Sequence, residues 1–113
     1  MNRWDVYWAD VPFEDDPTQS KVRPVIIAKD STVYVLTMRV TTHAPRDYDP
    51  YDYSLIEWQY ANLSAPSVVR IRKLAKLPPE KILSHIGRLH PSDMLGIQTK
   101  MDEYKAARDR ARR

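Results

Sequence analysis

The sequence predicts a mainly β protein, a small β-barrel with a C-terminal α-helix. Several short stretches alternate between apolar and polar residues, as half-buried strands do, and one longer stretch after residue 90 has a helical period. Nine prolines and two glycines in 113 residues favour many short elements over long helices. A chain of this length forms one domain with a modest core. We therefore expect a single domain, with the barrel at about residues 3–90 and the helix at about 91–110.

The first three strands follow from residues 4–41. Residues 4–11 (WDVYWADV) alternate in polarity, and a long polar loop separates them from the next apolar run. That run, Arg23–Lys29, opens with Arg23 and Pro24, and a proline lacks an N–H and suits the first residue of a strand. We expect a tight polar turn at KDST and a β-branched strand at 33–41, paired antiparallel with the strand before it.

The later strands are shorter and more interrupted. Residues 55–63 are expected to form a short strand that runs into one helical turn. Residues 67–74 (SVVRIRKL) alternate and predict a strand with a basic outer edge. The run LPPEKIL can start a single helical turn, since proline is tolerated there, and residues 85–89 (HIGRL) complete the strands.

One long helix is expected at the C-terminal end. It begins at Pro91 or Ser92, with Asp93 in its first turn, and basic residues crowd its last turns, where cations suit the helix dipole. Its apolar stripe, with the spacing of one helix face, consists of Met94, Ile97, Met101 and Tyr104. Strands followed by one helix predict that this helix packs across the barrel or at its end.

The charge of +3 is unevenly placed. Residues 1–99 hold twelve basic and twelve acidic side chains, whereas residues 100–113 hold six and three. Within the body, residues 67–90 carry six basic groups and one acid. A basic face opposite acidic loops is compatible with a polyanionic partner, although charge this mild is more often an ordinary solvated surface.

Several classes of protein and site are disfavoured. No cysteine is present, so disulfide and thiolate chemistry are excluded, and no segment is apolar enough to span a membrane. We expect a cytoplasmic protein with no membrane partner. His43, His85 and His90 lack metal-ligand spacing, so we expect no metal and no cofactor. The two glycines do not form a phosphate-binding loop, and there is no GxSxG motif.

A phosphate-binding site at one rim of the sheet is the chemistry that remains. If the KDST turn centres the hairpin, position i faces roughly 61 − i, which places Arg23 near residues 37–39. Thr41, Thr42 and His43 lie just beyond, within reach of an arginine side chain. An arginine fork and hydroxyl groups can hold a phosphate. The alternative is ordinary polar surface at a strand end. The run DYDPYDYS is too acidic to contact RNA, and we expect a solvated loop or a docking strip for a basic partner.

Ordered motifs along the chain resemble those of a known family. They are WDVYWADVPF, QSKVRPVIIAK, RVTTHAPR, APSVVRIRKL and IGRLHPSDMLGI. Their order and spacing are similar to those of the PemK/MazF family of bacterial toxin endoribonucleases. The resemblance implies an SH3-like small barrel, shared with the gyrase poison CcdB, that forms a homodimer. It also implies metal-independent, sequence-selective cleavage of single-stranded RNA through 2′-OH attack, and a cognate antitoxin whose acidic segment covers the RNA groove.

The resemblance also assigns residue roles. The family's catalytic arginine falls on Arg23, and its catalytic threonine falls on Thr41, with Thr42 as the competing assignment. His43 has a suitable pKa for an auxiliary acid–base role, which is a hypothesis. The residues expected to bind RNA are Gln19, Lys21, Arg39, Arg46, Arg70 and Arg72.

Two alternatives to cleavage stay open. The first loop, EDDPTQSK, has three acids and no glycine, unlike the glycine-rich loop of the family. A non-cleaving SH3-like module that binds RNA, an antitoxin-like protein or gyrase is therefore the leading alternative. The other is an interaction module whose basic C-terminal helix docks on an acidic partner.

Overall fold

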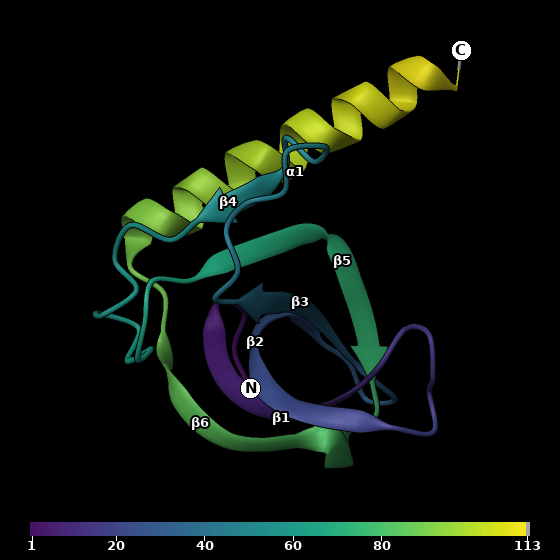
Figure 1. Ribbon diagram of the computed structural model, residues 1–113, viewed down its shortest axis with the longest axis vertical. Helices are drawn as coiled ribbons and strands as arrows, with labels where there is room; N and C mark the ends of the chain where they lie inside the picture. Colours follow the sequence, from purple (N-terminus) through teal and green to yellow (C-terminus); the bar gives the residue numbers. More distant parts are fainter. Residues whose placement is uncertain (113) are drawn as a thin grey trace.

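The structure is a computed structural model that describes residues 1–112, in which six strands form one sheet and one long helix follows them (Figure 1). The elements in chain order are β1 (Asp5–Pro12), β2 (Ser20–Asp30), β3 (Val35–Thr41), β4 (Asp52–Ser54), β5 (Val68–Leu77), the short 3₁₀ helix η1 (Pro79–Lys81), β6 (Ile82–Arg88) and α1 (Pro91–Ala111). The predicted mainly β fold with a C-terminal helix is therefore confirmed.

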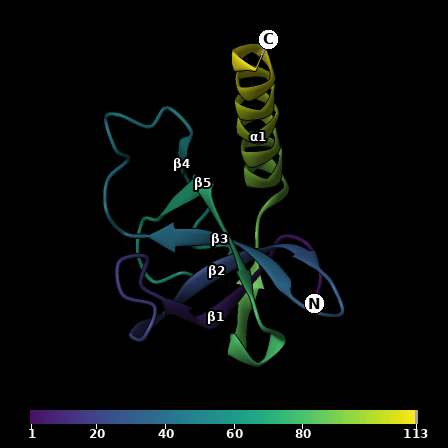
Figure 2. The ribbon, with the colours of Figure 1, turned by 90° about the vertical axis from the view of Figure 1, so that its right-hand side faces the viewer.

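The sheet curls strongly but stays open. Its strand order is β4-β5-β3-β2-β1-β6, and every neighbouring pair is antiparallel. Within the described residues no ladder joins β4 to β6, so the expected barrel is a curved sheet with two free edges. Figures 1 and 2 show this curl and a sharp bend in β5.

The core lies on both faces of the curled sheet. The larger cluster lies between the sheet, α1 and the segment after β4, and includes Val6, Ile26, Met38, Leu89 and Ile97. A smaller cluster on the other face consists of Ala9, Val11, Val25 and Leu77, with Ile82 packed against it. Burial on two faces explains why the alternation along β1 is imperfect, since neighbouring residues such as Asp5 and Val6 are both buried.

The helix packs as its sequence predicts. It begins at Pro91, Ile97 is fully buried, and Met94 and Met101 pack against the larger core cluster. Tyr104 continues the stripe by stacking edge-on against Tyr51, with ring centroids 5.2 Å apart. No helix in the described part of the chain combines the length and the apolar character needed to cross a membrane.

The strand expected at residues 55–63 is absent, and that prediction is wrong. The strand here is β4, three residues earlier, and residues 56–62 form turns. The backbone N–H groups of Ile56 and Glu57 donate to the carboxylate of Asp93, at 3.0 and 2.9 Å. These groups are therefore not available to a sheet ladder.

The β2–β3 connection also differs from the expectation. The turn lies at residues 31–34, where the N–H of Ser31 donates to the carbonyl of Tyr34 at 3.0 Å, and β3 starts only at Val35. Pro24 is the fifth residue of β2 and not the first. It pairs with Trp8 of β1, while the ladder to β3 begins at Val25, so its missing N–H breaks no bond on that side.

Candidate active site

A groove of about 250 Å³ opens where β2 begins and β3 ends. It gathers five residues that the sequence singled out: Lys21, Arg23, Thr41, Thr42 and His43. Its opposite wall comes from the segment between β4 and β5, which contributes polar groups at Asn62, Ser64 and Ser67. The predicted catalytic residues therefore share one solvent-accessible hollow.

The hairpin register aligns Arg23 with Thr41. Val25 pairs with Arg39 and Ile26 with Met38, so paired positions add up to 64 in this part of the ladder. The expected sum of 61 is wrong, because the turn at residues 31–34 lies two residues further along the chain than the KDST run, and the ladder shifts register by one between Ile27 and Lys29. The observed spacing, continued by two residues, sets Arg23 across from Thr41, and both side chains line the groove.

The end of β3 is held by a local hydrogen bond. The N–H of His43 donates to Oγ1 of Thr41 at 3.2 Å, as in turns made by threonine hydroxyl groups. A hydroxyl can accept this bond and still donate its own hydrogen. Thr41 therefore keeps a donor for a ligand, while Thr42 and His43 are exposed beside it.

Three arginines from three adjacent strands share one face of the sheet. Arg23 alternates with Val25, Val25 pairs with Arg39, and Arg39 pairs with Arg70. Burial lowers the pKa of Arg23, and repulsion from Arg39 and Arg70 lowers it further. The Nε atoms of Arg23 and Arg70 are buried, and neither donates to an acceptor within residues 1–112. Half-buried, repelling cations with unused donors favour an anion at this position.

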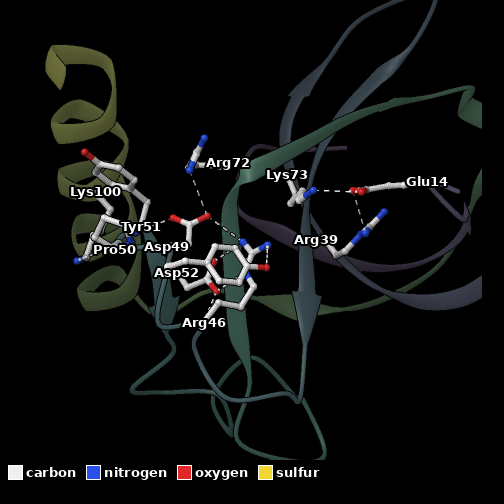
Figure 3. Close-up of polar contacts among 11 residues, drawn as sticks. Glu14, Arg39, Arg46, Asp49, Pro50, Tyr51, Asp52, Arg72, Lys73 and Lys100 are labelled. Carbon is white, nitrogen blue, oxygen red and sulfur yellow. Dashed lines mark hydrogen bonds and ion pairs between the residues drawn. The ribbon is translucent and has the colours of Figure 1, made fainter. Parts of the chain in front are cut away.

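A bulge in β5 places a further cation, Lys73, near these arginines. Met38 pairs with Leu74, but the next residue, Arg39, pairs with Arg70, so residues 71–73 have no partner on β3. Bulges bend a strand and redirect its side chains. Lys73 turns toward the β1–β2 loop, where its Nζ lies 3.1 Å from Oε2 of Glu14 (Figure 3). Glu14 also pairs with Arg39, at 3.4 Å.

Of the six residues expected to bind RNA, Lys21 lines the groove and the other five do not. Arg39 and Arg70 belong to the three arginines on one face of the sheet described above, and the remaining three residues have other contacts. Gln19 is in the exposed β1–β2 loop, where its carbonyl accepts from the N–H of Phe13. Arg72 lies 3.8 Å from Asp49, and its guanidinium stands over the ring of Tyr104 on α1. The third residue, Arg46, is described next.

Arg46 is engaged by the acidic segment that the sequence suggested was a solvated loop. Its side chain is only 12% exposed and donates to both carboxylate oxygens of Asp52, at 2.8 Å, and to Asp49 at 2.9 Å (Figure 3). The hydrogen bonds to Asp52 raise the pKa of Arg46. Arg46 therefore stabilises the loop that contains it, and most of its guanidinium donors are already used and not available to a phosphate.

Two residues of the site were not identified from the sequence. Trp8 was assigned to the apolar face of its strand, and it does continue the face of Val6, but it lies beyond the end of the core. Its side chain is 40% exposed and lines the groove. Lys73 was recognised only as part of a basic strand, because regular alternation does not predict a bulge. In residues 1–112 no three His, Cys, Asp or Glu side chains gather closely enough to hold a metal ion.

Comparisons with solved structures find the same fold. The chain is similar to an endoribonuclease solved in complex with its cognate antitoxin, from a mycobacterial species, with 18% identity and a TM-score of 0.67. That likeness covers 89% of this chain and 90% of the other. A second mycobacterial endoribonuclease structure has the same identity and TM-score and is covered to 86%. These structures share the fold. The comparison with curated proteins gives no match.

The family comparison covers almost the whole described chain. Residues 2–104 match the model of the PemK-like, MazF-like toxins of type II toxin–antitoxin systems. This range contains the entire sheet, the groove with Arg23 and Thr41, and the packed part of α1. The chain therefore belongs to the PemK-like, MazF-like toxin family of type II toxin–antitoxin systems.

Proposed function

We propose that this protein is a metal-independent endoribonuclease that cleaves single-stranded RNA, and that it acts as the toxin of its system. The observation that carries the proposal is the groove in which Arg23 lies across from Thr41, beside two further arginines and with unused guanidinium donors. A phosphodiester entering this groove would meet positive charge and hydrogen-bond donors. The exposed indole of Trp8 offers a neighbouring base a surface for stacking.

The reaction that suits these groups is transfer of the phosphate to the adjacent sugar oxygen. The 2′-oxygen attacks phosphorus as it loses its proton, the P–O5′ bond breaks, and the 5′-oxygen takes up a proton. The products are a 2′,3′-cyclic phosphate end and a 5′-OH end. This step consumes no water, so the site needs only to orient the 2′-OH, stabilise the phosphorane charge and assist proton transfer.

Each groove residue has a role in this step. Arg23 neutralises charge on the phosphorane oxygens, where its half-buried guanidinium interacts more strongly with that charge than it would in water. Thr41 donates a hydrogen bond to the phosphate or the 2′-OH; a threonine hydroxyl is too weak a base to take the proton. His43 serves as an auxiliary acid or base, so a His43→Ala variant is expected to have an altered pH–rate profile.

The proposal is tested by incubating the purified protein with a long single-stranded RNA in EDTA and mapping the new ends. We expect discrete cuts with cyclic phosphate ends, and a loss of about 10²–10³-fold in kcat/KM for Arg23→Ala. Lys29→Ala is the matched control, because Lys29 is an exposed cation at the other end of the same strand. Thr41→Val and Thr42→Val identify the reacting threonine. Intact RNA from a folded wild-type protein that binds it would support the non-cleaving alternative.

The partners belong to the same proposal. One structural neighbour was solved with its cognate antitoxin, and we extend that partnership to this chain. A homodimer would cover apolar side chains that the protomer leaves exposed, such as Ile56, Tyr60 and Leu95. Cytoplasmic RNA is the expected target, and no metal is expected to take part.

A further inference from the structure

A second hollow, of about 340 Å³, lies between the β1–β2 loop and the bend of β5. The loop contributes an apolar wall with Phe13, and the strands contribute cations. These cations are Arg39, Arg72, Lys73 and Lys76. The chemistry proposed for the groove uses none of the β5 residues in this hollow.

Among the described residues that line the hollow, Glu14 is the only one with a carboxylate, and this carboxylate lies between Arg39 and Lys73. Glu14 reaches from the loop to Lys73 at 3.1 Å and to Arg39 at 3.4 Å (Figure 3). The hydrogen bond from Lys73 and the charge of both cations lower the pKa of Glu14, so it is ionised at neutral pH. Its side chain remains 56% exposed, and exposed ion pairs of this kind are weak. Another anion can therefore replace it at little cost.

A row of arginines links the hollow electrostatically to the cleavage groove. Arg39 lines the hollow, pairs with Arg70, and contributes to the electrostatic field that lowers the pKa of Arg23. A chain of phosphates that places one group on Arg23 thus has its next positive contacts at Arg39 and Lys73. A polyanion with evenly spaced charges fits this row better than an isolated ion does.

We propose that this hollow binds the phosphate of a nucleotide that flanks the cleavage point of single-stranded RNA, and that Glu14 holds its place in the RNA-free protein. The inference rests on the proposed function, since it concerns the same RNA. Arg39 and Lys73 bind the phosphate, and Phe13 lies beside the base of the same nucleotide. The Glu14 carboxylate moves into solvent together with its loop. Because a phosphate contact carries no base information, the contact lengthens the footprint without narrowing the sequence preference.

The test compares binding of short and long RNA analogues. Mixed-sequence tetranucleotide and octanucleotide pools with 2′-O-methyl sugars cannot be cleaved, so fluorescence anisotropy reports binding alone. Wild type, Lys73→Gln, Glu14→Gln and the control Lys29→Gln are each measured with both pools. All of the changed side chains lie at the surface, and circular dichroism verifies folding.

We expect Lys73→Gln to weaken binding of the octanucleotide about fivefold or more and to leave the tetranucleotide almost unaffected, because one charge-assisted contact is lost. Glu14→Gln should tighten octanucleotide binding about threefold, because a competing anion is removed. Lys29→Gln should change neither.

Three results would overturn the inference. The first is equal weakening of both pools by Lys73→Gln. The second is weaker octanucleotide binding by Glu14→Gln, which would make Glu14 a contact and not a competitor. An acidic peptide that displaces the octanucleotide from wild type, with no length effect in Lys73→Gln, would assign the hollow to a protein partner. The two proposals fail separately. If the wild type cleaves RNA but Lys73→Gln does not selectively weaken octanucleotide binding, only the subsite is overturned. If Lys73→Gln selectively weakens octanucleotide binding but the wild type does not cleave RNA, only the cleavage proposal is overturned.

Discussion

Asp93 connects the start of α1 to the segment that follows β4. It is fully buried, and its carboxylate accepts hydrogen bonds from the Tyr53 hydroxyl and from the N–H groups of Ile56 and Glu57. Burial and this hydrogen bond raise the pKa of Tyr53, so the phenol stays a donor at neutral pH. The contact fixes the wall of the candidate groove to the helix, since that wall is formed by the same segment.

Gly96 is required by the close approach of Tyr53 to the helix. Its backbone is ordinary for a helix, but a Cβ atom there would lie 2.6 Å from carbons of the Tyr53 ring. We expect Gly96→Ala to lower the free energy of unfolding by about 1–2 kcal/mol, because this overlap outweighs the better helix propensity of alanine. Chemical denaturation measures the effect.

The same substitution in a protein that lacks the Tyr53 ring identifies the cause of that loss of stability. In a Tyr53→Ala protein the overlap is gone, and Gly96→Ala should then be neutral or stabilising. An equal loss of stability in both backgrounds would show that contact with the Tyr53 ring is not what excludes a side chain at residue 96.

Sequence reasoning at the level of single residues worked best where neighbours along the chain decide a position. Arg23 and Thr41 were expected near each other at strand ends, and both line the groove. The helix was expected to begin at Pro91 or Ser92, and the Nδ1 atom of His90 accepts from the N–H of Ser92 at that start. Asp93 was expected only as a first-turn acid. Its burial depends on hydrogen bonds from residues 36 to 40 positions away, which no local pattern contains.

Among the secondary-structure elements, β4 and the loop before it are stabilised by charge. Asp52 begins β4, its side chain is almost completely buried, and the Arg46 guanidinium contacts both of its oxygens. Hydrogen bonds from Arg46 lower the pKa of Asp52. The folded protein therefore holds this carboxylate ionised more strongly than the unfolded chain does.

The sign of this shift predicts a pH dependence for Asp52→Asn. The stabilisation is fully present above the ordinary carboxyl pKa of about 3.9 and is lost as the pH falls through the lowered folded value. At pH 7 we expect the free energy of unfolding of the variant to be about 2 kcal/mol lower than that of wild type, because the mostly buried Arg46 loses a charged partner. Denaturation at pH 7 and in acid checks this. A difference that does not shrink in acid would contradict it.

The strands of the sheet were predicted better than their pairing. Alternation placed β1, β2, β3 and β5 within a few residues, and the turn at η1 was expected from its prolines. The hairpin register was wrong by three positions, because it depended on a turn read from composition. The β5 bulge was not predicted, since residues 67–74 alternate as regularly as an unbroken strand does.

At the scale of the whole molecule, the excess positive charge and the candidate site are far apart along the chain. The basic residues of the last turns of α1 project beyond the sheet (Figures 1 and 2) and are exposed. The arginines of the site instead lie on the strands, within a part of the chain whose charges balance. Net charge was therefore a weaker guide to the site than the local placement of cations.

Removal of residues 106–113 tests this separation. We expect the free energy of unfolding to change by less than about 1 kcal/mol, because the removed side chains are mostly exposed and Tyr104 is retained. RNA cleavage should stay within about twofold of wild type. Loss of activity in a folded truncated protein would favour the alternative in which the basic helix docks on an acidic partner.

The bulge in β5 also separates the residues of this strand that pair with β3 from those that carry the proposed ligand contacts. The ladder to β3 is regular on both sides of it, at Leu74–Leu77 and at Val68–Arg70, so the pairing does not depend on which side chains occupy residues 72 and 73. Substitutions at these two residues leave the backbone pairing intact, and of the two only Arg72 also contacts Asp49 and Tyr104. Under the proposed function, residue 73 is therefore the natural position for a small library that varies the RNA footprint on a constant sheet.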